Sequence, residues 1–119
     1  MDRKLYNLKR LEEIAQGDQG FILDMVNIFV ENVTAEIGNI LSYKTEGNWK
    51  SIAESAHKLA SNFAYLGANA LHDLAANIEK KVIYENNLTG VAEKTDQLCQ
   101  EGTRLVDLVK KDFSINIAN

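Results

Sequence analysis

The sequence predicts an all-α protein, folded as an antiparallel up-down four-helix bundle with a short extra helix at its N-terminal end. Apolar residues recur at helical spacing in four long stretches, and the residues that break helices fall between these stretches. The chain contains no proline, and no stretch shows the period-two alternation of a β-strand. Four amphipathic helices joined by short loops bury their apolar faces most simply as such a bundle.

Glycines and capping residues mark the expected helix boundaries. A short leading helix over about residues 5–15 precedes a long second helix, and the next helix begins near Trp49. The glycines expected to end helices are Gly17, Gly47 and Gly67. The residues expected to cap the helices that follow are Asp18, Asn69 and Thr89.

Each expected helix carries an apolar stripe that is predicted to form the core. The long helix after Asp18 contributes Phe21, Met25, Ile28, Phe29, Val33, Ile37, Ile40 and Leu41. The later helices contribute Ile52, Ala53, Ala56, Leu59, Ala60 and Phe63, then Leu71, Leu74, Ala75 and Ile78, then Val91, Leu98, Leu105 and Leu108. The residues expected to pack on the bundle near its C-terminal end are Phe113, Ile115 and Ile117.

Length and charge fit a single domain over residues 1–119. An apolar share of 45% supplies one packed core but not two. The net charge of −4 is spread along the chain, so nucleic acid is not expected as a partner. No run approaches the roughly 20 apolar residues that cross a bilayer, and no signal peptide is evident. We expect a cytoplasmic, monomeric protein with no membrane association, and Met1 favours a free-standing chain.

The chain has two histidines, His57 and His72, and any catalytic role for imidazole must use one of them. At about 100° per residue, His57 lies roughly 100° from the centre of the apolar arc of its helix, on the shoulder. Its neighbours three, four and seven places away are Lys50, Glu54, Ala60, Ser61 and Ala64. Those on the C-terminal side are small, so the surface of another protein can reach the ring.

A neutral imidazole offers a ring lone pair at cell pH and can attack phosphorus directly. Phosphoryl transfer depends mainly on positioning and on stabilising the charge of the phosphoryl oxygens. The chain has no glycine-rich phosphate loop and no nucleotide-binding signature. These features alone leave two interpretations of His57 open: a nucleophile towards phosphorus in a chain without kinase machinery, and a surface histidine with no function.

The run from Ala56 to Ala68, AHKLASNFAYLGA, resembles the signature of histidine-containing phosphotransfer (HPt) domains. In that signature a phosphoacceptor histidine precedes a stretch of small residues and a Leu-Gly pair. The turn EGNW before the histidine helix also resembles the family, and Leu71, Leu74, Ile78 and Glu79 follow at its spacing. The motifs cover about residues 18–79, within a motif-bearing region of about 18–86.

The resemblance implies that His57 is the phosphoacceptor of a multistep two-component relay. It would take a phosphoryl group from an aspartate of one receiver domain and pass it to another. The implied partners are response-regulator receiver domains and a hybrid sensor kinase. No cofactor or metal is expected in this chain, because Mg²⁺ belongs to the receiver. The expected partner-binding residues are Lys50, Glu54, Lys58, Ala60, Ser61 and Ala64.

Two positions depart from the family pattern. The family commonly has lysine three residues after the histidine and glycine at the fourth, where this chain has Ala60 and Ser61. Losing the lysine removes a cation beside the developing phosphoryl charge, and Lys58 projects about 100° away around the helix. The alternative is therefore a catalytically inactive HPt-like module that docks a receiver without transfer.

A third interpretation is a metal-dependent bundle enzyme, because Glu54 and His57 form a Glu-x-x-His pair. The second pair that such a centre needs is absent, since Asn69 precedes His72 at that spacing. The single cysteine, Cys99, is expected to be a buried, reduced thiol.

Overall fold

The structure is a computed structural model that describes residues 5–113. Within this range every regular element is a helix, so the predicted all-α class is confirmed. The elements are α1 (Lys9–Ala15), α2 (Gln19–Glu46), α3 (Trp49–Tyr65), α4 (Asn69–Glu79), the π-helical segment η1 (Lys80–Tyr84) that continues α4, and α5 (Val91–Phe113).

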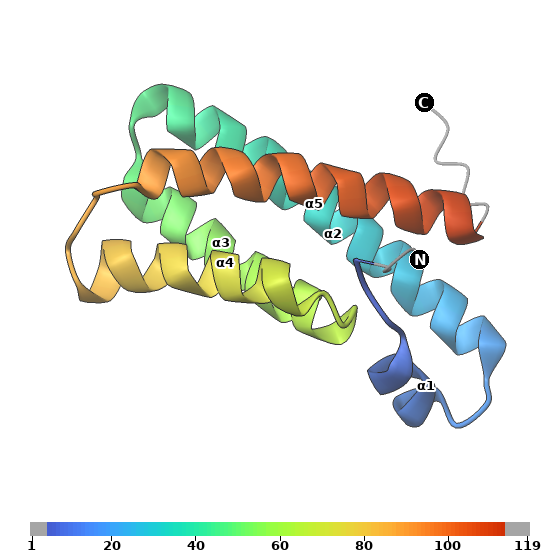
Figure 1. The fold of residues 1–119 in the computed structure, drawn as a ribbon. Coiled ribbons are helices and arrows are strands. Elements are labelled where there is room, and N and C mark those ends of the chain that lie inside the picture. Colours follow the sequence, from blue (N-terminus) through green and yellow to red (C-terminus); the bar gives the residue numbers. More distant parts are fainter. Residues whose placement is uncertain (1–4, 114–119) are drawn as a thin grey trace.

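Helices α2, α3, α4 and α5 lie alongside one another, and α1 lies at one end near the start of α2 (Figure 1). Contacts join α2 to α3, α3 to α4, α4 to α5, and α5 back to α2. The connections after α2 and after α3 are short, and the chain reverses direction at each of them. Helix α3 therefore lies between α2 and α4, and its remaining side is left for other contacts.

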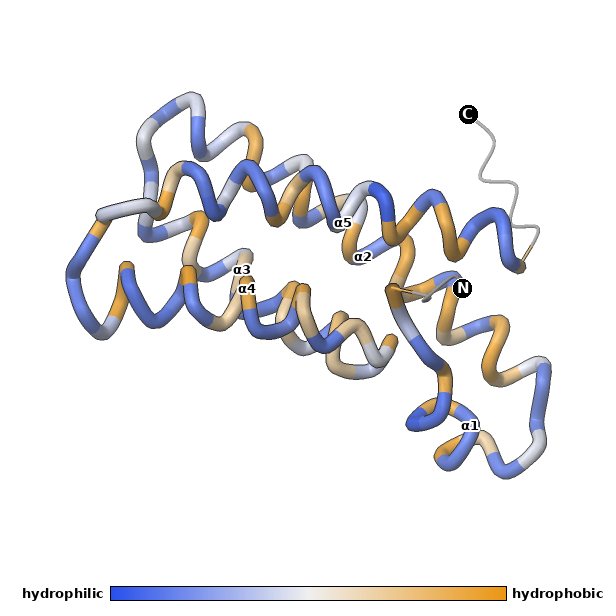
Figure 2. Tube along the Cα trace, in the orientation of Figure 1, coloured by the Kyte–Doolittle hydropathy of each residue, from blue (hydrophilic) through white to orange (hydrophobic). Residues whose placement is uncertain are grey.

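The core consists mainly of buried apolar side chains from helices α1 to α5. Hydrophobic positions recur along each of these helices (Figure 2). Most of the predicted core residues of α3 to α5 are buried, but the predicted stripe of α2 is partly wrong. Ile28 and Leu41 are 46% and 52% exposed. The inward face of α2 also includes residues that the prediction omitted: Ile22, Val26 and Val30. Since α2 is apolar on more than one side, spacing alone does not define its inward face.

One predicted cap is confirmed and two are wrong. The Asp18 side chain accepts a hydrogen bond from the Phe21 backbone N–H at 3.0 Å, as expected of an N-cap. Helix α4 already begins at Asn69, and Ala68 precedes it with no side-chain cap. Thr89 lies too early to cap α5, which begins at Val91 after Gly90. Cap positions depend on where each preceding turn ends, which the residue type does not determine.

The segment before α1 joins the α3–α4 turn to the end of α5. The Asn7 backbone N–H donates to the Leu66 carbonyl at 3.0 Å, and the Tyr6 hydroxyl donates to the Asp112 carboxylate at 2.6 Å. Burial, and then the Asp112 carboxylate, raise the pKa of the Tyr6 phenol, so this donor keeps its proton. Phe113 packs against the core as predicted, whereas Ile115 and Ile117 lie outside the described residues.

We expect Gly67→Ala to destabilise the protein more than Gly47→Ala. Both glycines have a positive φ, so a Cβ costs about 1–2 kcal/mol at either position. At Gly67 the new Cβ would also lie 2.5 Å from the Asn7 carbonyl oxygen, whereas nothing lies within 4 Å at Gly47. Steric crowding should add about 1–3 kcal/mol at Gly67. Urea unfolding measures the difference, and equal losses would show that the leading segment does not pack on the turn.

Candidate functional site

Helix α3 presents His57 on its outer side. The inner side is fixed by fully buried residues, among them Ile52, Ala56, Leu59 and Phe63, and the Asn48 side chain caps the helix start. With the inner face set by packing, the helical period directs His57 outward, and its side chain is 65% exposed. The ring therefore stands clear of the core, as the helical wheel predicts.

Glu79 of α4 holds one nitrogen of the His57 ring. Its Oε2 lies 2.9 Å from His57 Nδ1, and its own side chain is only 23% exposed. A carboxylate at this distance favours the tautomer in which Nδ1 carries the proton and donates it. That tautomer leaves the lone pair on Nε2, the nitrogen that does not contact Glu79. The arrangement orients a neutral nucleophile without a separate base.

The other predicted site residues differ in their exposure. Lys50, Glu54 and Ser61 are exposed on the His57 side of α3, and Ala64 is half-buried. Ala60 is only 8% exposed, so it offers little surface to a partner. Among residues 5–113 the Ser61 hydroxyl makes no hydrogen bond, so it is free to donate to a ligand.

Lys58 turns towards α2 and away from His57. Its Nζ lies 4.0 Å from Oε2 of Glu36, a carboxylate on α2 whose side chain is only 16% exposed. The other oxygen of Glu36 is buried and has no hydrogen-bond partner among residues 5–113. Glu36 was not among the predicted site residues, because nothing in its local pattern distinguishes it from a surface acid. Its carboxylate attracts the Lys58 ammonium group from α3 towards α2.

The remaining candidates lie apart from His57. His72 Nδ1 lies 3.1 Å from the carboxylate of the adjacent Asp73. In the part of the chain that the structure describes, no group of three or more His, Cys, Asp or Glu side chains could hold a metal ion. Cys99 is a buried, free thiol, as predicted, and burial is the main cause that raises its pKa.

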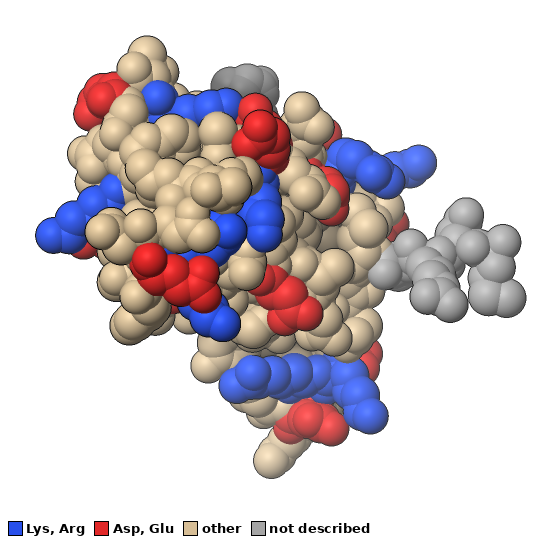
Figure 3. Space-filling model, turned by 60° about the vertical axis from the view of Figure 1, so that its left-hand side comes forward, with Lys and Arg blue, Asp and Glu red and all other residues tan. Residues whose placement is uncertain are grey.

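The surface shows no separation of charge on the face in Figure 3, where basic and acidic side chains are interspersed. No helix between residues 5 and 113 combines the length and the apolar character that crossing a membrane requires.

The comparisons with known proteins identify the family. A family model described as "Hpt domain" matches residues 24–110, which include His57 and Glu79. Searches among curated proteins and among solved structures found no match. Hpt domains are phosphocarrier modules that interact with receiver domains in two-component phosphorelays. Because the matched range takes in most of the chain, from α2 to α5, this protein belongs to the Hpt domain family.

Proposed function

We propose that this protein relays a phosphoryl group between receiver-domain aspartates through His57. One observation carries the proposal: in a chain of the Hpt family, the His57 ring is exposed and its Nδ1 lies 2.9 Å from the Glu79 carboxylate. This contact leaves Nε2 free to meet an aspartyl phosphate on a docked receiver. The hybrid sensor kinase and the response regulators at either end of the relay supply and consume the phosphoryl group.

The transfer needs no proton movement at the attacking atom. The Nε2 lone pair attacks phosphorus, the bond from phosphorus to the aspartyl oxygen breaks, and its electron pair stays on the aspartate carboxylate. The new N–P bond leaves a positive charge on the ring, and the Glu79 carboxylate stabilises this charge through the Nδ1 proton. Transfer to the second receiver reverses these steps. A Mg²⁺ ion held by the receiver would neutralise the phosphoryl oxygens, and the proposal requires no cofactor in this chain.

Ser61 takes over part of the role that the family lysine has in this step. Ala60 occupies the lysine position and is buried, and Lys58 lies against Glu36. Ser61 follows His57 by one helical turn, and side chains on a helix lean towards its N-terminus. Its free hydroxyl is therefore directed towards the ring and can donate to a phosphoryl oxygen. A hydroxyl is a weaker electrostatic partner than an ammonium group, so we expect slower transfer than with lysine.

The second candidate function is receiver docking without transfer. The observation that favours it is that Ala60 replaces the family lysine, while Lys58, the next lysine along α3, lies near Glu36 of α2. This function would use the same exposed face, with Lys50, Glu54, Lys58, Ser61 and Ala64 in contact with the receiver. The two functions differ only in whether His57 becomes phosphorylated.

The contacts among α2, α3, α4 and α5 support an antiparallel four-helix bundle as the scaffold for this function, with α1 at one end. We further propose that residues 1–119 act as one domain, as a monomer in the cytoplasm. Receiver domains are soluble partners, so the proposed exchange needs neither a membrane nor nucleic acid.

We expect His57→Gln to abolish labelling by a phosphorylated receiver while the helical circular dichroism stays unchanged. The label on the parent protein should be acid-labile and sensitive to hydroxylamine, because it is a phosphoramidate. His72→Gln is the matched control and should still become labelled, because His57 remains. Labelling that survives in His57→Gln would exclude this residue as the acceptor.

We expect Glu79→Ala to slow transfer about 10- to 100-fold, because carboxylates that orient a histidine typically have effects of this size. The variant should also shift the His57 ring towards the Nε2-protonated tautomer, which ¹⁵N NMR detects directly. Glu79→Gln should retain part of the rate, since its amide oxygen still accepts from Nδ1. Glu93→Ala, which removes an exposed acid on α5 away from the docking surface, is the control. An unchanged tautomer in Glu79→Ala would contradict this role.

We expect Ser61→Ala to lower the transfer rate about 3- to 10-fold, the effect of one hydrogen bond. Ala60→Lys should raise the rate, because a long lysine stem can extend from a buried position and return the missing cation. When Ala60→Lys is also present, Ser61→Ala should lower the transfer rate by a smaller factor. Ser42→Ala, an exposed serine on α2, is the control. If the parent binds receivers but is never labelled, the docking function is the correct one.

A further inference from the structure

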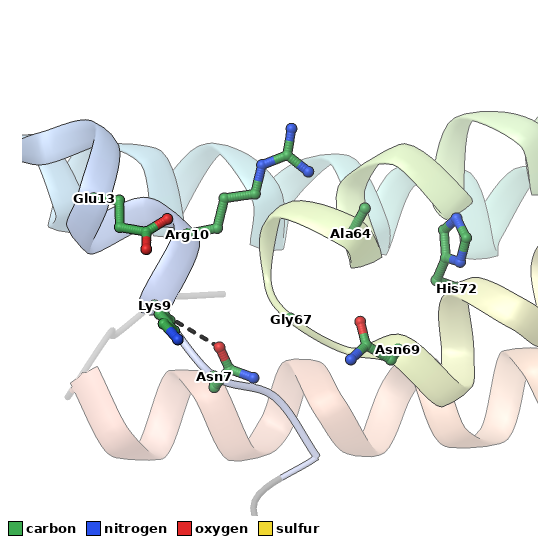
Figure 4. Close-up of a pocket in the computed structure, with 8 residues that line it drawn as sticks. All are labelled: Asn7, Lys9, Arg10, Glu13, Ala64, Gly67, Asn69 and His72. Carbon is green, nitrogen blue, oxygen red and sulfur yellow. Dashed lines mark hydrogen bonds between the residues drawn. The ribbon is translucent and has the colours of Figure 1, made fainter.

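An open hollow of about 570 Å³ lies between α1 and the turn that joins α3 to α4 (Figure 4). Two cationic side chains line it, Lys9 and Arg10, against one acid, Glu13, and His72, which contacts Asp73, also borders it. Gly67 of the turn and Ala64 of α3 line it as well. The hollow is thus more basic than the chain as a whole, which carries a net charge of −4.

The two cations of α1 have no acidic partner within the described part of the chain. No carboxylate of residues 5–113 lies within ion-pair distance of Lys9 or Arg10. In the lower part of Figure 3, at the level of α1, basic side chains lie beside an acidic one. Since neither charge is neutralised internally, both remain available to an anionic group from outside.

Arg10 is held in place by aromatic side chains. The centre of its guanidinium group lies 4.4 Å from the centroid of the Tyr65 ring, and Tyr65 stacks on Phe29 with their centroids 5.4 Å apart. This stack reduces the rotamer freedom that Arg10 would lose on binding. The edges of a guanidinium group stacked in this way can still form two parallel hydrogen bonds to one carboxylate.

The hollow continues the face that carries His57. His57 contacts Glu79 where α3 packs against α4. Seven residues along each helix from this pair, Ala64 of α3 and His72 of α4 border the hollow. Two helical turns separate the two points, which is about 10.5 Å. A protein that covers about 800 Å² around His57 must also reach this edge.

We propose that this hollow receives an acidic side chain of the receiver domain that docks on His57. The inference rests on the proposed function, because the receiver is the partner that function requires. The pairing of Lys9 and Arg10 with a receiver carboxylate would set partner choice and affinity, and it would leave the chemistry at Nε2 unchanged.

The test is phosphotransfer from the receiver that labels His57, measured as kcat and kcat/KM at low and high salt. We expect Arg10→Glu to lower kcat/KM about 10-fold or more with kcat retained, since a mispaired charge weakens docking but not transfer. The kcat/KM of Arg10→Lys should lie between those of the parent protein and Arg10→Glu. Arg104→Glu, on α5, makes the same charge change away from the hollow and should have little effect. The salt dependence of kcat/KM should weaken in Arg10→Glu.

Equal kcat/KM for Arg10→Glu and Arg104→Glu, with His57 still labelled, would overturn the inference and leave the proposed function intact. Failure of every receiver to label the parent protein would overturn both. Inorganic phosphate gives a further control by thermal shift. If phosphate stabilises the parent but not Arg10→Glu, and the substitution leaves kcat/KM for transfer unchanged, the hollow binds a free anion and the docking inference is wrong.

Discussion

The contact between His57 and Glu79 is the interaction on which the proposed chemistry depends. It joins two helices, so it exists only because the core sets the register of α3 against α4. Phe63 of α3 and Ile78 of α4 are both fully buried, and the short turn between the helices leaves little freedom to slide. Rotation of either helix by one residue, about 100°, would separate the carboxylate from the ring. The apolar core thus selects the tautomer of the nucleophile.

The sequence predicted the exposure of His57 but not its partner. Exposure follows from the period of α3 alone, because its apolar residues form one clear arc. The pairing with Glu79 depends on the register between two helices, and no pattern within either helix encodes it. The same distinction explains the error at Ile28, since α2 is apolar on more than one side and its neighbours decide which residues are buried. Asn69 failed as a cap because the preceding turn ends one residue earlier.

In the proposed function, the site divides the work of transfer between two proteins. This chain would offer an oriented lone pair and a compensating carboxylate, but the position of the family lysine is taken by the small, buried Ala60, and Lys58 lies near Glu36. The charge of the transferring phosphoryl group must then be balanced mainly by the receiver and its metal ion. Positioning contributes more to phosphoryl transfer than covalent chemistry does, so a small helical domain can still serve as the carrier.

In the relay proposed here, recognition and chemistry would reside in different parts of the chain. His57 and Glu79 lie within the range that the Hpt family model matches, residues 24–110, whereas Lys9 and Arg10 precede it. The leading segment is nevertheless anchored to the site, because Asn7 bonds to Leu66 at the end of α3 and Arg10 lies over Tyr65. If the hollow receives a receiver carboxylate as proposed, substitutions in α1 would change which receivers dock without altering the His57 ring or its tautomer. A relay domain built in this way would acquire new partners while its proposed acceptor histidine stays the same.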